Sequence, residues 1–455
     1  MKSHPHDLLL QEFAATLTGE PQEILDHLIA CASCQRRLRS LMHPRPSALA
    51  QKVVPLDRQR VEPVDYAPIL DRASRSLREI ESAYARERAE ARELFAELAH
   101  HSPERRTLLV RNSTRFHSWG LCELLLRRSR EQNFYDAVQG ESLARLALEV
   151  LDHLAASGYG AESLEDLRAR AWAYIANSRR VNSDLRGAEE AFALAFASLK
   201  RGTQEPMEKA VLLDLRASLF RAQRRFPEAL RSLRRAIRIF CQIGERHRAG
   251  RALVSLSTVH HFTGQPEKAI PLLYQALELI DPNREPRLLL VAWHNLTAEL
   301  VEARQFMEAQ KLLVKIRPLY QRFAQPWTRN PRKWIEGKIA LGLGQREQAE
   351  TLFLVARDGF LAEGAAYDTA LVSLDLASLY AEQGGMAELK RVAEQMVPIF
   401  SSRQIHREAL AALSYWRQAV EAEQACASLV AGVASFLKRA RHDPELRFEM
   451  PTASA

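Results

Sequence analysis

The stretch FPEAL at residues 226–230 decides the fold, because variants of it return at a nearly constant interval along the chain. These variants read GAEEAF, QPEKAI, FMEAQ, EQAET and MAELK. Steps of 41, 40, 40, 40 and 40 residues separate the anchor positions of the six copies, which are Ala188, Ala229, Ala269, Ala309, Ala349 and Leu389. A fixed period of this length indicates one supersecondary unit that is stacked several times.

The residues around each anchor indicate paired helices. Apolar side chains return four and seven positions after it, on one stripe of a helix. The positions four after are Phe192, Leu233, Leu273, Leu313, Phe353 and Ala393, and those seven after are Ala195, Ala236, Ala276, Ile316, Ala356 and Met396. A small residue, which lets two antiparallel helices approach closely, stands twelve positions before every anchor. These small residues are Ala176, Ala217, Ser257, Thr297, Gly337 and Ala377.

Two further positions complete the pattern. Trp172 and Trp293 stand sixteen positions before their anchors, and Gly264, Gly344 and Gly384 stand five before theirs, where a turn is expected. The spacing resembles the tetratricopeptide repeat over about residues 168–400. Each unit is about six residues longer than the usual repeat of about 34, which implies longer helices stacked in the same way. We therefore predict an all-α chain built mainly as an α-solenoid of about 40-residue helical hairpins.

Composition excludes several classes of protein. The formal net charge of +8 is spread over 64 basic and 56 acidic residues, which describes a mixed surface and gives no support for nucleic acid, which is not expected as a partner. The longest apolar runs, such as Leu288 to Trp293, are too short to span a bilayer. The start MKSHPHDLLLQEF lacks the pattern of a signal peptide. We expect a cytoplasmic protein without a membrane span.

A second motif, HLIACASC at residues 27–34, points to metal chemistry. The segment PQEILDHLIACASCQRRLRSL reads as one helix, on which Cys31 lies about 40° from His27 and Cys34 about 20° to the other side. One imidazole and two thiolates on a single face supply three ligands of a tetrahedral Zn²⁺ site. The fourth ligand is expected from His4 or His6, with His43 as a weaker candidate.

This motif resembles the zinc-binding anti-sigma domain, whose signature is a histidine, three residues, a cysteine, two residues and a cysteine. His27, Cys31 and Cys34 match that signature, and His4 fits the upstream ligand position better than His6. The resemblance covers about 40 residues and implies binding of a sigma factor of the extracytoplasmic-function (ECF) type.

Other interpretations of the cysteine pair stay open. A leucine-rich helix can bury two cysteines as small hydrophobes. A redox dithiol would be expected after a strand at the start of a helix, whereas about ten helical residues precede Cys31. The basic residues that follow are either a solvated helix end and linker or a strip that meets an acidic partner. They are Arg36, Arg37, Arg39, Arg45, Lys52, Arg58 and Arg60.

The predicted organisation has six parts. They are a zinc-binding helical domain at 1–42, a proline-rich basic linker at 43–65, a helical lead-in with a degenerate repeat at 66–165, the repeats at 166–405, capping helices at 406–441 and a tail at 442–455. We find no phosphate-binding loop and no catalytic triad, and the histidine pairs at 100–101 and 260–261 lack a third ligand at useful spacing. The glycines of LGLGQRE, residues 341–347, are assigned to a repeat turn.

These features together predict a regulator rather than an enzyme. The zinc domain would bind an ECF-type sigma factor, and the solenoid would bind a second protein or peptide. The alternative is a scaffold or adaptor in which the solenoid does all the recognition and the zinc domain is purely structural.

Overall fold

The computed structural model describes residues 33, 34, 37, 67–133, 135–323, 325–396, 407–441 and 446–449. The chain divides into two compact units, Met1–Glu79 and Ile80–Ala455. The predicted boundaries of the zinc domain and the linker fall outside the described residues and stay predictions. The helices with defined bounds lie in the second unit, apart from the first of them. That helix begins at Ala67, in the first unit, and continues into the second.

The described residues form helices and contain no strand, which confirms the predicted fold class. Before the repeats come α4 (Ala67–Ala99), α5 (Pro103–Asn112), η2 (Thr114–Phe116), α6 (Trp119–Gln132), α7 (Ala137–Asp152) and α8 (Ala156–Tyr159). The six hairpins are α9 (Ala161–Val181) with α10 (Leu185–Arg201), α11 (Pro206–Ala222) with α12 (Phe226–Gln242), α13 (Arg246–Phe262) with α14 (Pro266–Leu279), α15 (Pro286–Glu302) with α16 (Phe306–Arg322), α17 (Pro326–Gly342) with α18 (Arg346–Ala362), and α19 (Ala366–Glu382) with α20 (Met386–Gln395). The chain continues with α22 (Arg407–Glu421) and α23 (Ala427–Ala440).

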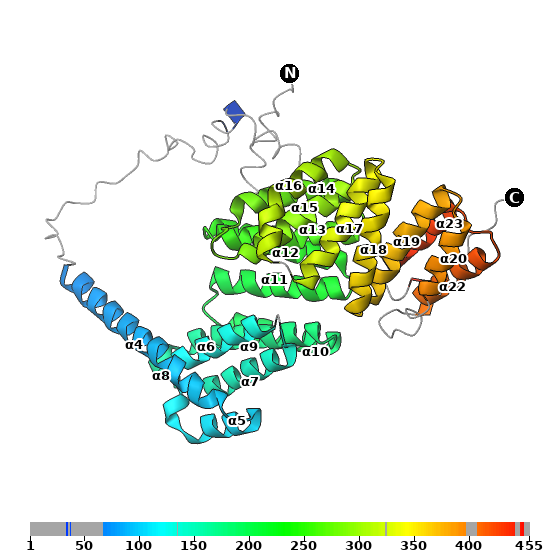
Figure 1. The fold of residues 1–455 in the computed structure, drawn as a ribbon. Helices are drawn as coiled ribbons and strands as arrows, with labels where there is room; N and C mark the ends of the chain where they lie inside the picture. The colour runs from blue at the N-terminus through cyan, green and yellow to red at the C-terminus, as the bar shows by residue number, and fades with distance from the viewer. Residues whose placement is uncertain are drawn as a thin grey trace. The chain divides into compact units, whose positions relative to one another are not determined.

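The hairpins follow the predicted period. The first helices of five successive hairpins begin at residues 206, 246, 286, 326 and 366. Each first helix packs against its partner and against neighbouring hairpins, so the pairs lie side by side (Figure 1). Proline opens several of these helices, at a position where its missing N–H costs nothing. The 40-residue helical hairpin is therefore confirmed.

The anchors lie in the core, as their spacing requires. All six are at most 1% exposed, and so are five of the small residues twelve positions earlier. Gly337, the sixth, shows why size matters there, because a Cβ at this position would lie 2.6 Å from the ring of Phe353 on α18. Buried side chains of neighbouring hairpins join into continuous hydrophobic clusters. Stability thus comes from close contact between stacked pairs.

The turn inside each hairpin has one geometry in all six repeats. The residue five before the anchor has a φ of 60° to 79°, at Ser183, Arg224, Gly264, Arg304, Gly344 and Gly384. The next N–H donates to the carbonyl five residues earlier at 2.8–3.0 Å, which closes each turn in the same way. Three repeats therefore place a residue other than glycine in the left-handed region, although this costs about 1–2 kcal/mol. Sequence spacing identified only the three glycines.

One glycine was assigned the wrong role. Gly344 has the positive φ expected of a turn residue, but Gly342 is the last residue of helix α17. A Cβ at Gly342 would lie 2.4 Å from the ring of Phe306 on α16. Gly342 is small because α17 and Phe306 approach closely, and the turn does not require it.

The last two helices close the stack in an altered arrangement. If the last two helices formed a seventh hairpin in the same register, its first helix, α22, would lie beside α19, the first helix of the sixth hairpin. Instead α23 packs against α19, while α22 packs against α20 and α23. This arrangement brings the end of α23 onto the face formed by the first helices of the repeats. Of the helices described, none is long and apolar enough to cross a membrane.

Candidate functional site

A groove of about 630 Å³ lies where the first helices of successive repeats meet the end of α23. Its walls come from α13, α15, α17 and α19 on one side and from α23 on the other. The side chains at its centre are His261, His294, Glu302, Trp334, Lys338, Leu371 and Lys438. The volume falls within the range of about 300–1,000 Å³ that is usual for ligand sites.

The repeat geometry explains why these side chains gather. His294 and Trp334 are one period apart, fifteen positions before their anchors, and Ala298 and Lys338 are one period apart, eleven positions before theirs. Equivalent positions on stacked hairpins face the same surface. The groove is therefore lined by side chains that have one place in the repeat but different chemistry in each copy.

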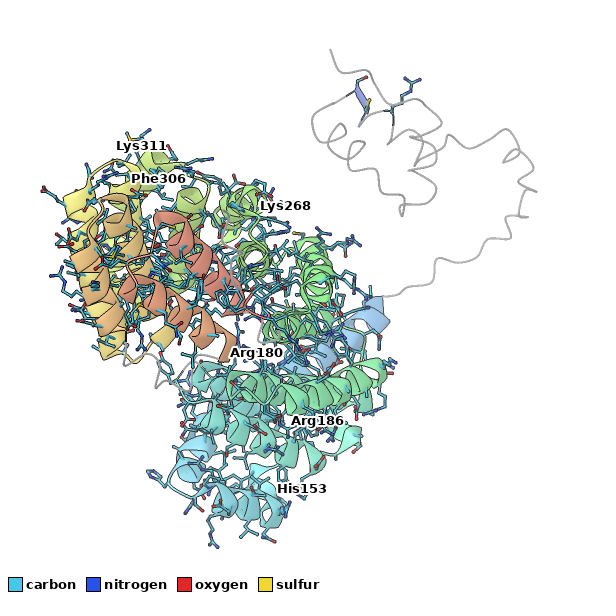
Figure 2. All side chains as sticks on the ribbon, turned by 90° about the vertical axis from the view of Figure 1, so that its right-hand side faces the viewer. His153, Arg180, Arg186, Lys268, Phe306 and Lys311 are labelled. Carbon is cyan, nitrogen blue, oxygen red and sulfur yellow. The ribbon has the colours of Figure 1, made fainter. Side chains whose placement is uncertain are left out.

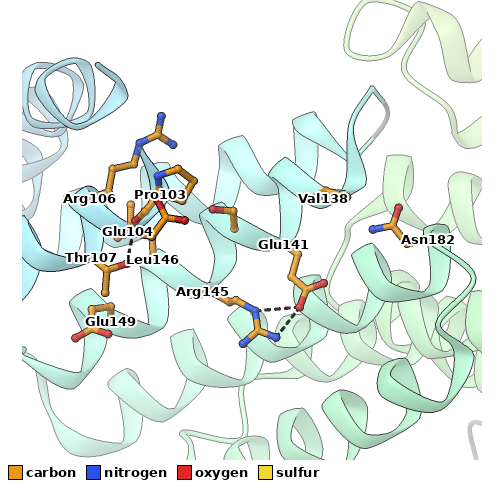
Figure 3. Close-up of a pocket in the computed structure, with 11 residues that line it drawn as sticks. Pro103, Glu104, Arg106, Thr107, Val138, Glu141, Arg145, Leu146, Glu149 and Asn182 are labelled. Atoms are coloured by element: carbon orange, nitrogen blue, oxygen red, sulfur yellow. Dashed lines mark hydrogen bonds and ion pairs between the residues drawn. The ribbon is translucent and has the colours of Figure 1, made fainter. Parts of the chain in front are cut away.

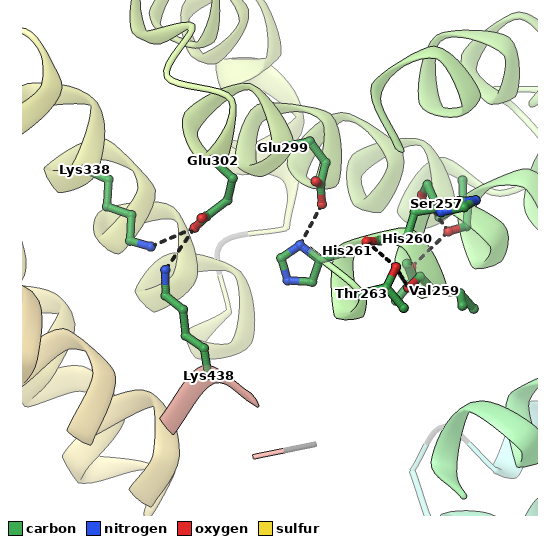
Figure 4. Close-up of polar contacts among 11 residues, drawn as sticks. Ser257, Val259, His260, His261, Thr263, Glu299, Glu302, Lys338 and Lys438 are labelled. Carbon is green, nitrogen blue, oxygen red and sulfur yellow. Dashed lines mark hydrogen bonds and ion pairs between the residues drawn. The ribbon is translucent and has the colours of Figure 1, made fainter. Parts of the chain in front are cut away.

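Glu302 of α15 connects two lysines across the groove. Its carboxylate accepts hydrogen bonds from Lys338 Nζ at 3.3 Å and Lys438 Nζ at 3.4 Å (Figure 4). Burial alone would raise the pKa of Glu302, but the two ammonium groups outweigh it and lower that pKa to about 2. The pKa of Lys338 is raised despite burial, because Asp375 and Glu302 lie near it. Glu302 and Lys338 are therefore both charged at neutral pH.

Arg441, directly after α23, joins distant parts of the same face. Its guanidinium forms a two-pronged ion pair with Asp368 of α19 at 2.6 and 2.9 Å. Its carbonyl oxygen accepts a hydrogen bond of 3.5 Å from Arg224, in the turn after α11. Residues from the second and the sixth hairpin therefore meet at the end of the last helix.

Aromatic side chains give the groove its apolar surface. The indole N–H of Trp334 donates to Asp375 at 2.6 Å, and Lys338 Nζ lies 4.8 Å from the centre of the same indole ring. His294 Nδ1 lies 2.7 Å from the hydroxyl of Tyr320. Burial lowers the pKa of His294 to about 4, so this histidine is neutral at pH 7. The groove thus combines a fixed indole face with charged groups.

Two other groups at the edge complete the site. His261 Nδ1 lies 2.7 Å from a carboxylate oxygen of Glu299, whose side chain is only 4% exposed (Figure 4). Arg439 on α23 is exposed and forms no ion pair within the described part of the chain. The groove can therefore offer an incoming chain both an unpaired cation and paired charges that can exchange partners.

A second hollow, of about 480 Å³, lies over α5 and α7 (Figure 3). Its charged side chains already have partners. Glu141 accepts from Arg145 at 2.7 Å and from Arg179 at 3.1 Å, and Glu149 pairs with Arg111 at 2.7 Å. No aromatic side chain lines it. The groove at α23 is the better candidate site.

The predicted zinc ligands lie almost wholly outside the described residues. Cys34 is helical and 3% exposed, as either a zinc ligand or a core cysteine would be. His4, His6, His27 and Cys31 fall outside the described part, so zinc stays a prediction. Among the residues that are described, no cluster of three or more His, Cys, Asp or Glu is placed to hold a metal.

Sequence reasoning missed the groove. Its side chains differ from repeat to repeat, so they carry no periodic signal, and the return of α23 depends on tertiary packing. The available clue was the position fifteen before the anchor, where His294 and Trp334 stand in place of the aliphatic residues of three other copies, Ala173, Val254 and Leu374. His260, predicted to be structural, is 5% exposed, and its Nδ1 lies 3.2 Å from Gln265.

Comparisons with known proteins agree with this architecture. Residues 208–281, which cover α11 to α14, match the family model described as tetratricopeptide repeat. The match lies within the α-solenoid and covers two of its helical hairpins. A search of curated proteins gives no match.

Two solved structures share the fold. A Rap protein complexed with competence and sporulation factor is 12% identical, with a TM-score of 0.52, over 69% of this chain and 85% of that one. The apo form of RapI is also 12% identical, with a TM-score of 0.50, over 70% of this chain and 86% of that one. At this identity the likeness concerns the fold alone.

Proposed function

We propose that this chain is a protein-interaction regulator whose solenoid holds a protein or peptide segment in the groove beside α23. The observation that carries the proposal is the groove itself, where Trp334 presents an apolar face next to the Lys338, Glu302 and Lys438 charges. A site that binds a peptide segment needs apolar pockets for anchoring side chains and polar groups that fix its direction. The groove offers both.

The shared fold supports this role. The Rap protein of similar fold is complexed with competence and sporulation factor, so a solenoid of this architecture accommodates a bound partner. In the present chain, a bound segment would compete with α23 for the groove. Lys438 and Glu302 are 44% and 38% exposed, and ion pairs of that exposure contribute about 0–1 kcal/mol each. Breaking the Lys438–Glu302 pair alone would therefore cost little, whereas Arg441 and Asp368 would also have to separate before the end of α23 could move.

For the amino-terminal part, we propose a zinc site formed by His27, Cys31 and Cys34 with His4, or His6 in its place. When bound, Zn²⁺ would link the first residues to the helix and stabilise a domain too small for a large core. The proposed partner of this domain is an ECF-type sigma factor. The burial of Cys34 is compatible with this site.

Regulation requires the two parts to communicate. A ligand of the solenoid changes sigma-factor binding only if it binds the free and the sigma-bound states with different affinity. We propose a cytoplasmic regulator without catalytic activity that works in this way. In the alternative, a scaffold with a purely structural zinc domain, sigma factor would not bind the amino-terminal part at all.

Capture experiments with the full-length chain test the proposal. Purified ECF sigma factors from the same cell are passed over the immobilised protein and over two variants. We expect Cys31→Ser with Cys34→Ser to abolish sigma capture and Trp334→Ala to leave it intact, because the groove is proposed to bind the second partner. If the cysteine variant captures sigma factor as well as the unchanged protein does, the anti-sigma part of the proposal is wrong.

A further inference from the structure

A cluster of arginines lies on α6, before the repeats, and on the first helices of the second and third hairpins, α11 and α13. Three arginine side chains line one hollow together with Asp214 of α11, and a fourth arginine acts on the same carboxyl group through its charge. These arginines, called here the arginine cluster, are Arg130 of α6, Arg221 of α11, and Arg248 and Arg251 of α13. Asp214 occupies the same repeat position as Trp334, three periods earlier. The cluster therefore shares the inner surface of the repeats with the groove.

The cluster is short of anions. Within the described residues no ion pair holds Arg130 or Arg221, and none joins Asp214 to any of the four arginines. The other two arginines have only distant partners, with Arg248 Nε 3.5 Å from Glu245 and Arg251 3.9 Å from Glu285. Arg248 Nε is also buried without a hydrogen-bond partner in the described structure. Four arginines thus share three carboxylates, those of Asp214, Glu245 and Glu285, and among the residues described none of their ion pairs is shorter than 3.5 Å.

Burial makes the shortage of anions around these arginines energetically unfavourable. Arg130 and Arg221 are half-buried, and loss of hydration lowers the pKa of each. The same effect, together with the charge of Arg221, lowers the pKa of nearby Arg180 to about 10 (Figure 2). Desolvated charges without counter-ions are unfavourable in a folded protein unless a partner is supplied. The cluster has the electrostatics of a site that awaits an anion.

A small hollow opens at this place. It measures about 20 Å³ and is lined by Arg130, Arg248, Arg251 and Asp214 together with Tyr174 and Phe240. A space of that size holds about one water molecule, so a carboxylate would place one oxygen there, between the aromatic and the guanidinium side chains. A larger ligand would insert one group here and continue along the inner surface.

We propose that the arginine cluster binds the carboxylate groups of an acidic protein segment. The proposal rests on the solenoid's role as a binding surface for a protein or peptide, and it names the chemistry of that partner. The planar fork of a guanidinium matches a carboxylate with two parallel hydrogen bonds. Arg130 lies on α6 and Arg251 on α13, so a bound carboxylate would bridge two helices.

The geometry favours a peptide over nucleic acid. Binding of a nucleic-acid backbone relies on many solvent-exposed cations that displace condensed counter-ions. Here the cations are half-buried around a narrow hollow, which a continuous chain of phosphates cannot enter. A single carboxylate side chain can place one oxygen in this hollow and meet the guanidinium groups that line it.

Fluorescence polarisation with the full-length chain tests the proposal. The probe is a fluorescein-labelled peptide of alternating glutamate and serine, compared with its glutamine counterpart and with an oligonucleotide of equal charge. We expect Arg130→Gln and Arg251→Gln each to weaken binding of the glutamate peptide about 10-fold. We expect Asp214→Asn to strengthen it, because the competing carboxylate is removed. Arg186→Gln on α10 is the control, since the side chain of Arg186 is 94% exposed (Figure 2).

Each outcome supports or contradicts the binding of an acidic segment by the arginine cluster. The proposal would be overturned if Arg186→Gln weakened binding of the glutamate peptide as much as the cluster variants do. It would also be overturned if the glutamine peptide bound as well as the glutamate peptide, or if the oligonucleotide bound more tightly. No detectable binding of the glutamate peptide would overturn it too. Circular dichroism confirms that each variant is folded, and Asp214→Asn serves as a gain-of-binding test that unfolding cannot mimic. If a partner protein binds the unchanged chain and all cluster variants equally, the solenoid's proposed function stands and only the acidic partner is wrong.

Discussion

Lys438, in the last turn of α23, donates a hydrogen bond to Glu302 of α15, a residue 136 positions earlier, at 3.4 Å. Lys338 of α17 donates to the same oxygen at 3.3 Å. One carboxylate therefore links two repeats and the final helix on the inner face of the solenoid. This contact makes the candidate groove a joint product of the repeats and of the segment that closes them.

The pH dependence of stability should report on this carboxylate. The folded-state pKa of Glu302 is lowered to about 2, below its value in the unfolded chain. Its stabilising contribution is then fully present above about pH 4.5 and is lost as the pH falls toward about 2. We expect Glu302→Gln to lose less stability than the unchanged protein between about pH 6 and about pH 3, as measured by urea unfolding. Parallel losses would show that the lysines do not stabilise the carboxylate.

Close approach of α17 and α18 predicts a size limit at Gly337. We expect Gly337→Ala to lower the free energy of unfolding by about 1–3 kcal/mol, because the new Cβ would meet the Phe353 ring at 2.6 Å. Gly432, within helix α23, is the matched control, since a Cβ there meets nothing within 4 Å. Gly432→Ala should be neutral or stabilising. If both variants melt at the temperature of the unchanged protein, the packing of this hairpin is described wrongly.

The turns predict a stabilising substitution. Arg304 has a φ of 60° and is exposed, so its side chain adds strain without packing. We expect Arg304→Gly to raise the free energy of unfolding by about 0.5–1 kcal/mol, whereas Arg304→Ala, which keeps the Cβ, should not. Chemical denaturation of the two variants measures the difference. A stabilising alanine together with a neutral glycine would contradict the left-handed turn.

Metal analysis tests the predicted zinc site. Protein purified under reducing conditions should carry about one equivalent of Zn²⁺, and Cys31→Ser with Cys34→Ser should remove it. His4→Ala and His6→Ala, made separately, identify the fourth ligand by which one loses metal. Less than about half an equivalent in the unchanged protein would mean that the two cysteines are core residues or a redox pair.

The repeat could be predicted from the sequence because its packing residues repeat. Ala229 and its equivalents occupy one place in every copy, so the fixed spacing identified the fold and the buried helix faces. The turn at Arg304 could not be found in this way, since only the repeated geometry forces a residue other than glycine into it.

The candidate groove, unlike the repeats, could not be predicted from the spacing of residues in the sequence. Trp334, Lys338 and Lys438 share no sequence pattern, and the last of these reaches the groove only because α23 packs on α19. The same holds for the arginine cluster, whose members come from three helices. Periodicity therefore predicts the scaffold, whereas the binding surface lies at the positions where the copies differ.

Site-specific photo-crosslinking tests the central claim, that the groove holds a protein or peptide segment, most directly. A photoreactive amino acid replaces Ala298, which lines the groove, or Met307 on α16, which is 59% exposed, in the full-length chain expressed in its own cell. We predict that position 298 forms a crosslink to one identifiable protein or peptide, that position 307 does not, and that Trp334→Ala abolishes the crosslink. Identical products at both positions, or none at position 298, would contradict the account.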